Sequence, residues 1–368
     1  MKLAVCRPAH TLNVRDKKFI NVYQKLGLDV LFLGNSRRCN EESAECFPCA
    51  HKYVGFGYPY LSKWVPIGTL GFNAGLTKHL GSTRPDIVHA GDLESLIGTL
   101  LYRMLFNKHC RIVYDIADTF SARYRIPGFL SLLIQGVDDV FARGCDEVIL
   151  PQENRRQNFV ISEPRKIVFI LNCPSLCDAP PVLPLPDRQP LRIILSGYLT
   201  WTRGIREIVE AGKRANSVQF LAMGQYEKGV REYLINSGIT ECCPMSSQRD
   251  VLRLTTSCHL VAAFYNPDRK INRQAAPNKL YDAMAACRPL LINSEVEISR
   301  LVSDEWCCGY AVPFSDTERL AGLFNEISLN DEECRIRGEN GRKLFETTYN
   351  WEAMERRISE MVGRLLSD

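Results

Sequence analysis

Two places in the later half of the sequence set a cation at a predicted helix start. Lys279 stands on the first turn of a helix that opens at Pro277, where the missing N–H of proline costs nothing. Arg203 directly precedes a helix-forming run at 204–215. A helix start offers free N–H groups and the positive end of a dipole, so both places suit an anion such as phosphate. Together they predict a diphosphate site; the alternative is two ordinary surface helices with solvated cations.

The segment that precedes the helix of Lys279 is mostly polar. The segment 266–276 is a long polar loop with three basic residues, and long irregular loops inside a domain are often functional. The helix after it keeps an apolar face made of Leu280, Ala283, Met284 and Cys287. Asp282 lies on another face, three residues from Lys279 and therefore beside it. The sequence thus predicts a helix that packs by one face and presents charge on another.

The elements that position these residues alternate between short apolar runs and longer helical ones. Strands are predicted at 2–6, 29–34, 86–90, 111–116 and 147–151, and again at 191–197, 218–224, 259–265 and 289–293. Helices are predicted at 15–27 and after Asp92, which is expected to be a helix cap. The segment 172–190 carries six prolines and is predicted to be a linker.

Two successive β/α series predict an α/β protein with two doubly wound, Rossmann-like domains and parallel sheets. The first domain is expected at 1–172 and the second at 187–349. In such folds ligands bind at the carboxyl ends of the strands, so we expect them in the cleft that the two domains face.

Composition and charge narrow the class of protein. The chain has 368 residues, 45% hydrophobic and 24% charged, with a net charge of +4, which is typical of a soluble globular protein. Residues 1–172 hold 22 Lys/Arg against 16 Asp/Glu, so the first half is the better candidate for an anionic surface, but the excess is too small for nucleic acid. Fifteen scattered cysteines and the lack of a secretory signal predict free thiols and a cytoplasmic location.

No stretch of the sequence is a credible transmembrane helix. Two short segments of the first half allow more than one interpretation. The segment 53–76 is rich in aromatic residues beside Lys63, which suits a membrane interface; the favoured alternative is a buried hydrophobic loop. Four potential zinc ligands lie close together at Cys39, Cys46, Cys49 and His51. No second Cys-x-x-Cys pair supports them, so no metal site is predicted.

Five segments resemble the glycosyltransferase family 4 group, which has the GT-B fold. They are "RPDIVHAGDLES", "DEVILPQENRRQNF", "LRIILSGYLTWTRGIREIVEAGKRA…VQFLAMGQ", "PNKLYDAMAACRPLL" and "YNWEAMERRISEMVGRLL". The resemblance covers nearly the whole chain. It implies that the second domain holds a nucleotide-sugar donor and the first an acceptor, and that the last helix, at 350–368, crosses back to the first domain.

The resemblance also implies roles for the residues that match the family's motifs. Arg203 and Lys279 would be the catalytic cations that neutralise the diphosphate, and Asp282 stands at the second acidic position of the E-x7-E signature, which usually grips the ribose. The other donor-binding positions are Gly197, Tyr198, Gly204, Gly224, Gln225, Gln274 and Asn278. The acceptor-side positions are Arg7, His89, Asp92, Asp115 and Asp118.

Several positions depart from the family's pattern. Gln274 stands where the signature has its first glutamate, and Asp282 shortens the second. Tyr198 replaces an arginine or similar residue after the glycine of the turn, and Ala117 replaces a frequent histidine. The glycine-rich loop after the first strand is also absent. Such variants are familiar in polysaccharide-building members, so the identity of the donor sugar stays open.

The resemblance implies a retaining, metal-independent transfer of a hexosyl or N-acetylhexosaminyl group in polysaccharide biosynthesis. The donor would be a uridine or guanosine diphosphate sugar, with no further cofactor. The acceptor would be a glycan or lipid-linked glycan at the inner membrane face, with an anionic membrane surface as a partner. The leaving diphosphate can take the acceptor proton, which agrees with the lack of a convincing carboxylate pair.

Two alternatives remain. Gln274 and the missing histidine leave open a non-catalytic nucleotide- or glycan-binding subunit on the same fold. A nucleotide-sugar epimerase is less favoured, because it needs acid and base side chains around the sugar that the sequence does not place.

Overall fold

The computed structural model describes residues 1–37, 47–57, 65–117, 120, 128–244, 247–275 and 277–367. The chain divides into two compact units: unit 1 is Met1–Leu171 with Glu355–Asp368, and unit 2 is Asn172–Met354. Between the last strand of unit 1 and the first of unit 2, the proline-rich segment 172–190 forms one short 3-10 turn, η2 (Leu176–Asp178), and otherwise has neither helix nor strand. The division into units falls at the start of this predicted linker.

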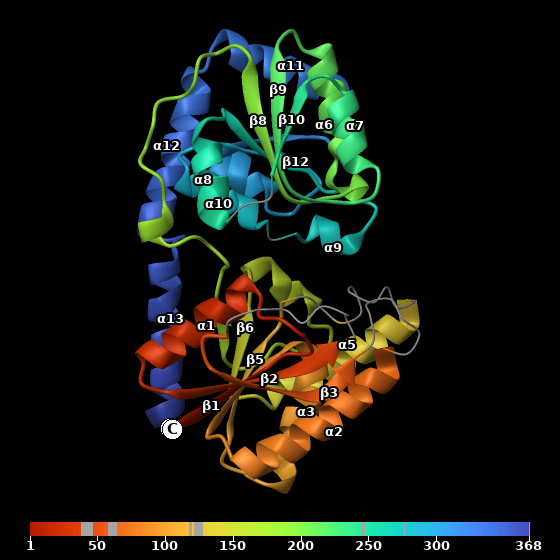
Figure 1. The fold of residues 1–368 in the computed structure, drawn as a ribbon, viewed down its shortest axis with the longest axis vertical. Helices are drawn as coiled ribbons and strands as arrows, with labels where there is room; N and C mark the ends of the chain where they lie inside the picture. Colours follow the sequence, from red (N-terminus) through yellow and green to blue (C-terminus); the bar gives the residue numbers. More distant parts are fainter. Residues whose placement is uncertain are drawn as a thin grey trace. The chain divides into compact units, whose positions relative to one another are not determined.

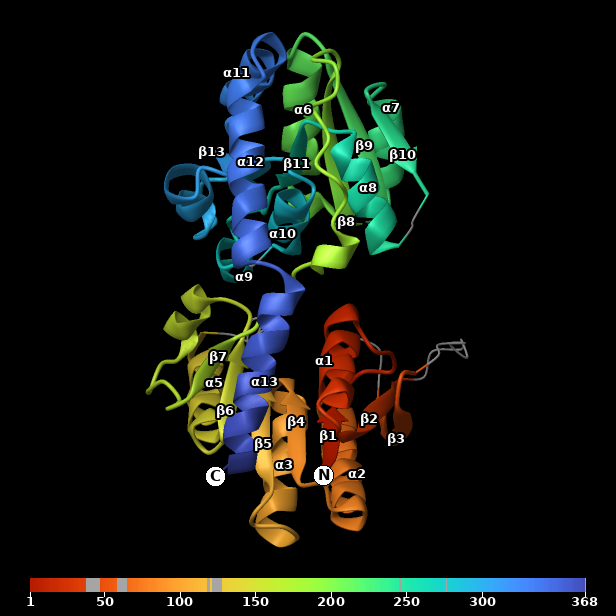
Figure 2. The same ribbon diagram turned by 90° about the vertical axis from the view of Figure 1, so that its left-hand side faces the viewer.

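Unit 1 is built on a parallel sheet of seven strands. They are β1 (Lys2–Cys6), β2 (Asp29–Arg37), β3 (Ala50–Gly57), β4 (Ile87–Gly91), β5 (Arg111–Asp115), β6 (Glu147–Leu150) and β7 (Ile167–Phe169). The strand order is β3-β2-β1-β4-β5-β6-β7, so the direction of winding reverses between β1 and β4. The helices are α1 (Val14–Lys25), α2 (Val65–Thr83), α3 (Asp92–Leu105) and α5 (Gly128–Arg143), with the 3-10 turn η1 (Glu153–Asn158). In Figures 1 and 2, α2, α3 and α5 cover the face opposite to α1.

Unit 2 repeats this plan with a parallel sheet of six strands. They are β8 (Leu191–Leu199), β9 (Val218–Tyr226), β10 (Thr240–Cys243), β11 (Leu260–Ala263), β12 (Leu290–Asn293) and β13 (Gly309–Val312), in the order β10-β9-β8-β11-β12-β13. Its helices and turns are η3 (Trp201–Arg203), α6 (Ile205–Arg214), α7 (Val230–Asn236), α8 (Gln248–Thr256), α9 (Lys270–Arg273), α10 (Asn278–Ala285), η4 (Leu301–Glu305), α11 (Thr317–Leu329) and α12 (Glu332–Thr347). The winding reverses between β8 and β11. The predicted class, two doubly wound units with parallel sheets, is confirmed.

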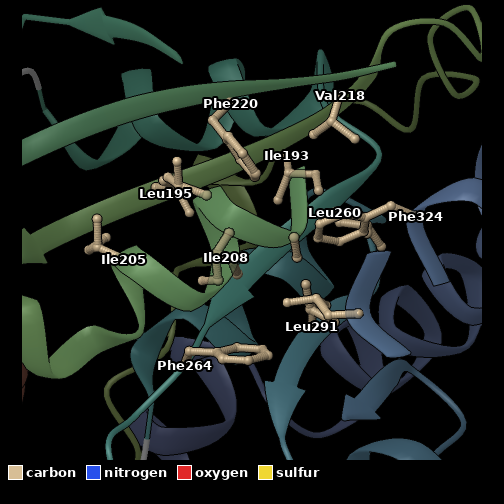
Figure 3. Packing of buried hydrophobic residues seen from close by; sticks show 14 of the residues in the cluster. Ile193, Leu195, Ile205, Ile208, Val218, Phe220, Leu260, Phe264, Leu291 and Phe324 are labelled. Atoms are coloured by element: carbon tan, nitrogen blue, oxygen red, sulfur yellow. The ribbon is translucent and has the colours of Figure 1, made fainter. Parts of the chain in front are cut away.

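Apolar runs in the strands of unit 2 form the core that fixes the positions of its loops. Figure 3 shows Ile193 and Leu195 of β8 and Phe220 of β9 packed with Ile208 of α6 and Phe324 of α11. Because helices cover both faces of a parallel sheet, its strands are buried on both sides and read as continuous apolar runs. This core holds the carboxyl ends of β8 and β11 in place.

The last helix, α13 (Trp351–Ser367), begins in unit 2 and ends in unit 1, as predicted. Within unit 1, Arg364 pairs with the buried Glu147 of β6 at 2.9 Å, and Arg357 donates to the carbonyl oxygen of Phe169 at 3.0 Å. Lys25 of α1 pairs with Glu355 at 2.7 Å, so α13 lies on the same face as α1 (Figure 2). The end of the chain is thereby part of the first unit.

The prediction of a hydrophobic loop at 53–76 is wrong. The segment supplies the end of β3, which pairs with β2, and the first half of α2. Its glycines are points of close packing: a Cβ on Gly55 would lie 2.7 Å from the Cα of Phe72, and one on Gly75 would overlap the carbonyl oxygen of Val54. Glycine therefore lets α2 lie directly on β3. None of the described helices is long and apolar enough to span a bilayer.

Candidate functional site

The two predicted cation sites lie side by side in unit 2. β8 and β11 are neighbours in the sheet and pair in parallel, Ile193 opposite Leu260. The loops that follow them are bonded to each other, because the N–H of Asn266 donates to the carbonyl oxygen of Thr202 at 2.9 Å. Ligands of doubly wound folds bind at such a strand edge, where the winding reverses.

Arg203 is held at this edge by its neighbours in both loops. Its guanidinium stacks over the ring of Tyr265, 4.3 Å from the ring centre. The next residue, Gly204, has φ +66°, and a Cβ there would lie 2.5 Å from the Cβ of Phe264. A glycine is therefore required for the turn to enter α6 while it packs against the end of β11.

Gly197 and Gly224 lie opposite each other where β8 and β9 approach closely. Both have positive φ, +87° and +151°, and a Cβ on Gly224 would overlap the carbonyl oxygen of Gly197. The predicted strand ends at these two glycines are wrong by two residues, because both strands continue to Leu199 and Tyr226. Tyr198 and Gln225 are exposed on these last residues of the strands.

Lys279 reaches under the same edge from α10. Its Nζ donates to the carbonyl oxygen of Ala262 at 3.3 Å, and its Cε lies 3.8 Å from the position of a Cβ on Gly197. Burial and the nearby charge of Arg203 lower the pKa of Lys279 to about 7, against the opposing effect of Asp282. A second positive charge is thus disfavoured here, and a bound anion would relieve that cost.

The remaining predicted donor residues lie around the start of α10. The helix begins at Asn278, which is exposed, and Pro277 is its N-cap rather than its first helical residue. Asp282 accepts a hydrogen bond from Nε2 of Gln248 at 3.2 Å. Gln274 is buried directly after α9, so the predicted irregular loop contains one helical turn.

Sequence reasoning missed the residues that support this edge. Asn293, the last residue of β12, bonds both backbone groups of Tyr265: it accepts from the N–H at 2.8 Å and donates to the carbonyl oxygen at 3.1 Å. Glu295 in turn accepts from Asn293 at 2.9 Å. The available signal was a polar residue closing the apolar run of a strand, since a polar side chain at that place usually has a partner.

Four of the five predicted acceptor-side residues meet in unit 1, at the carboxyl ends of β1, β4 and β5. The buried Arg7 pairs with Asp92 at 3.2 Å and with Asp115 at 2.5 Å. His89 is fully buried, with Nε2 3.6 Å from Asp115. Asp118, the fifth, lies outside the described residues. The structure thus joins residues more than 100 positions apart into one buried ionic network.

Three further members of this network were missed. Asp16 accepts from Arg7 at 2.6 Å, Arg15 pairs with Asp115 at 2.8 Å, and the hydroxyl of Tyr23 bonds Nδ1 of His89 at 2.8 Å. All three lie on α1, directly after β1, which places them at the same strand edge.

The charges of the network are largely engaged with one another. Burial alone would raise the pKa of Asp115, but Arg15 and Arg7 outweigh it and hold that pKa well below its usual value. Burial also opposes the charge of Arg7, but its three carboxylate partners raise the pKa of Arg7. The predicted cap role of Asp92 is wrong: Asp92 is the first residue of α3, has φ +61°, and accepts from the N–H of Ala117 at 3.2 Å. Strain of this kind is often found at functional sites.

Two of the four potential zinc ligands considered in the sequence, Cys39 and Cys46, lie outside the described residues. Cys49 is half-buried, and the ring of His51 stacks on Phe47 with 3.9 Å between the ring centres. Within the described ranges, no group of three or more potential ligands could hold a metal ion. The cysteines of these ranges are free thiols, as predicted.

Comparison with solved structures defines the fold. The chain is similar to sucrose-phosphate synthase from Thermosynechococcus elongatus, with 15% identity, a TM-score of 0.79, and coverage of 100% of this chain and 99% of that one. It is similar to Anabaena HepE in complex with UDP and glucose, with 13% identity, a TM-score of 0.72, and coverage of 99% of this chain and 100% of that one. It is also similar to WaaG, a glycosyltransferase of lipopolysaccharide biosynthesis, with 15% identity, a TM-score of 0.65, and coverage of 98% and 100%. Neither a protein-family model nor a curated protein sequence matches the chain. The chain therefore has the fold of GT-B glycosyltransferases, as predicted.

Proposed function

We propose that the protein is a glycosyltransferase that moves a sugar from a nucleoside diphosphate sugar to an acceptor hydroxyl. The observation that carries the proposal is the convergence of Arg203 and Lys279 on adjacent strand ends of unit 2, beside the first residues of α10. Two cations and a helix start match the two phosphates of such a donor. The fold supports the same class, since HepE, which shares it, binds UDP and glucose.

The proposed reaction breaks the bond from the anomeric carbon to the diphosphate and forms a bond to the acceptor oxygen, with retention of configuration. Negative charge grows on the leaving phosphate, where Arg203 and Lys279 stabilise it. The leaving oxygen takes the acceptor proton, so the transfer needs neither a protein base nor a metal ion. Gly197, whose Cβ position has only the Cε of Lys279 within 4 Å, leaves room for the donor to approach the backbone. Gly204 and Gly224 shape this edge by allowing close packing against Phe264 and Gly197.

The finer assignments follow the family resemblance. Asp282 would contact the ribose, and Gln274 would contact another part of the donor. Tyr198, Gln225 and Asn278, which are exposed, would also be donor-binding residues. The sugar would be a hexose or N-acetylhexosamine from a uridine or guanosine diphosphate.

The acceptor would be a glycan or lipid-linked glycan. It would bind unit 1 near the network of Arg7, His89, Asp92 and Asp115, at the strand edge where the winding reverses. Because residues 1–172 carry six more basic than acidic side chains, we place the protein at the cytoplasmic face of an anionic membrane.

The test is donor binding and turnover by three variants. A thermal-shift panel of uridine, guanosine and adenosine diphosphate sugars identifies the donor, since a ligand of the folded state raises apparent stability. Release of the nucleoside diphosphate and mass spectrometry of the products then measure turnover. We expect Arg203→Ala and Lys279→Ala to abolish turnover and weaken binding, while Lys213→Ala, at an exposed site on α6, behaves as wild type.

The proposal fails if both site variants bind and turn over like the wild type. Donor binding without turnover of any acceptor would instead indicate a non-catalytic subunit, and an isomerised sugar nucleotide would indicate an epimerase.

A further inference from the structure

Helix α5 exposes a row of apolar side chains. Phe129 is 76% exposed, and Leu132, Leu133, Val137 and Val140 are exposed by 61, 60, 49 and 52%. Their spacing of three and four residues places them along one side of the helix. Surface helices ordinarily turn such a stripe toward the core.

The two acidic residues of α5, Asp138 and Asp139, are both buried. Asp138 accepts a hydrogen bond from the hydroxyl of Tyr114 at 2.6 Å. Asp139 accepts from the N–H groups of Val160 and Ile161 at 2.6 and 2.9 Å. Because these carboxylates fix the orientation of the helix from inside, the outward position of its apolar stripe is a stable feature of the fold.

The loop bonded to Asp139 extends the apolar stripe. Val160 and Ile161 are about half exposed, and the Cδ1 of Ile161 lies 3.2 Å from the position of a Cβ on Gly136, in the middle of α5. The α5 stripe with Val160 and Ile161 is called the apolar patch below. A contiguous exposed surface of this kind marks an interaction site.

A cationic hollow adjoins the end of the apolar patch. Its volume is about 580 Å³, and it is lined by Val140 of the patch and by Arg111, Arg143, Arg165 and Lys166. Its acidic residue, Asp146, pairs with Arg111 at 3.3 Å. Arg143, Arg165 and Lys166 are exposed, so the hollow presents net positive charge beside an apolar surface.

We propose that this face of unit 1 docks on an anionic lipid bilayer. The apolar patch enters the interface, and the cationic hollow binds headgroup phosphates. A second copy of the chain fits less well, because in a two-fold dimer the partner surface is this same face, which offers the cationic edge no excess of negative charge. The inference rests on the membrane partner proposed above and assigns its contact to α5 rather than to the segment 53–76.

Flotation with lipid vesicles tests this surface. The full chain is mixed with vesicles of phosphatidylcholine alone or with one-third phosphatidylglycerol. We expect the wild type to float with the anionic vesicles only. Leu132→Glu should weaken binding on the order of tenfold, and the pair Arg143→Glu and Arg165→Glu on the order of fivefold for each cation removed. Leu329→Glu, at a leucine of unit 2 that is even more exposed than Leu132, should float like the wild type.

Each other outcome overturns a defined part of the inference. A wild type that does not float refutes the membrane partner. The proposed glycosyltransferase function is tested separately, by donor binding in solution. Flotation that Leu132→Glu does not reduce, in a protein whose melting temperature is unchanged, refutes the α5 surface. A wild-type dimer in light scattering that Leu132→Glu converts to monomer makes the patch a contact between copies of the chain.

Discussion

The low pKa of Lys279 makes anion binding a proton-uptake reaction. With a pKa of about 7, half of the Lys279 side chains are neutral at pH 7 in the free protein. A diphosphate beside the ammonium group favours its charged form and returns the pKa toward its ordinary value of roughly 10.4. Binding should therefore take up about 0.1 proton at pH 6, about 0.5 at pH 7 and about 0.9 at pH 8.

The sign of the pH dependence follows directly. Because protons are taken up on binding, affinity for the diphosphate falls as pH rises above 7, toward a limit of about tenfold per pH unit. Isothermal titration calorimetry of uridine diphosphate in two buffers with different ionisation enthalpies measures the proton number at each pH. The nucleotide itself releases some protons, since the second pKa of a phosphate group is about 6.

The Lys279→Arg variant supplies the baseline. Arginine stays charged throughout this range, so the variant keeps a cation at the site but takes up no proton at that position. We expect the difference between wild type and variant to rise from pH 6 to pH 8 as calculated above. Equal proton numbers for the two proteins across this range would refute the placement of Lys279 against the diphosphate.

Three further predictions concern the residues that build the two strand edges. Gly224→Ala should lower the melting temperature and abolish nucleotide binding, because its Cβ overlaps the carbonyl of Gly197 at φ +151°. Gly71→Ala, in open space on α2, should leave nucleotide binding unchanged and should not lower the melting temperature, because alanine favours a helix interior more than glycine does. Asp115→Asn should lower the free energy of unfolding in urea by about 3 kcal/mol, because it leaves Arg7 and Arg15 incompletely paired in a buried site. The pKa of Asp115 is lowered in the folded state, so the stabilisation by its ionised carboxylate is present above pH ~4 and is lost as pH falls through the folded-state pKa. The free energy of unfolding of the variant should therefore depend less on pH in that acid range than that of the wild type. Arg288→Met should lower the free energy of unfolding by about 3 kcal/mol and speed proteolysis at 172–190. The reason is that the buried guanidinium of Arg288 donates hydrogen bonds to the carbonyl oxygens of Leu183 and Pro184 and so holds that segment against unit 2. Unchanged proteolysis would contradict this role.

The sequence was sufficient to predict the fold and the meeting of the two cation sites. Apolar runs at 191–197 and 259–265 mark buried parallel strands, and consecutive β/α units of one hand leave few ways to order them. Once β8 and β11 are neighbours, the loops after them share one strand edge. The adjacency of Arg203 and Lys279 follows from this order.

Features that depend on approach between distant segments could not be predicted. The glycines of 53–76 resembled loop signals because their function, to let α2 lie on β3, is visible only when both elements are in place. The pairing of Arg7 with Asp115 spans 108 positions, and no local pattern announces it. The low pKa of Lys279 likewise arises from burial and a neighbour 76 residues away.

A co-crystal structure with the nucleoside diphosphate selected by the thermal-shift panel tests the central claim most directly. The account predicts both phosphates at the carboxyl ends of β8 and β11, within hydrogen-bonding distance, about 3 Å, of the Arg203 guanidinium and Lys279 Nζ. A diphosphate bound elsewhere, with these two side chains directed away from it, would contradict the account.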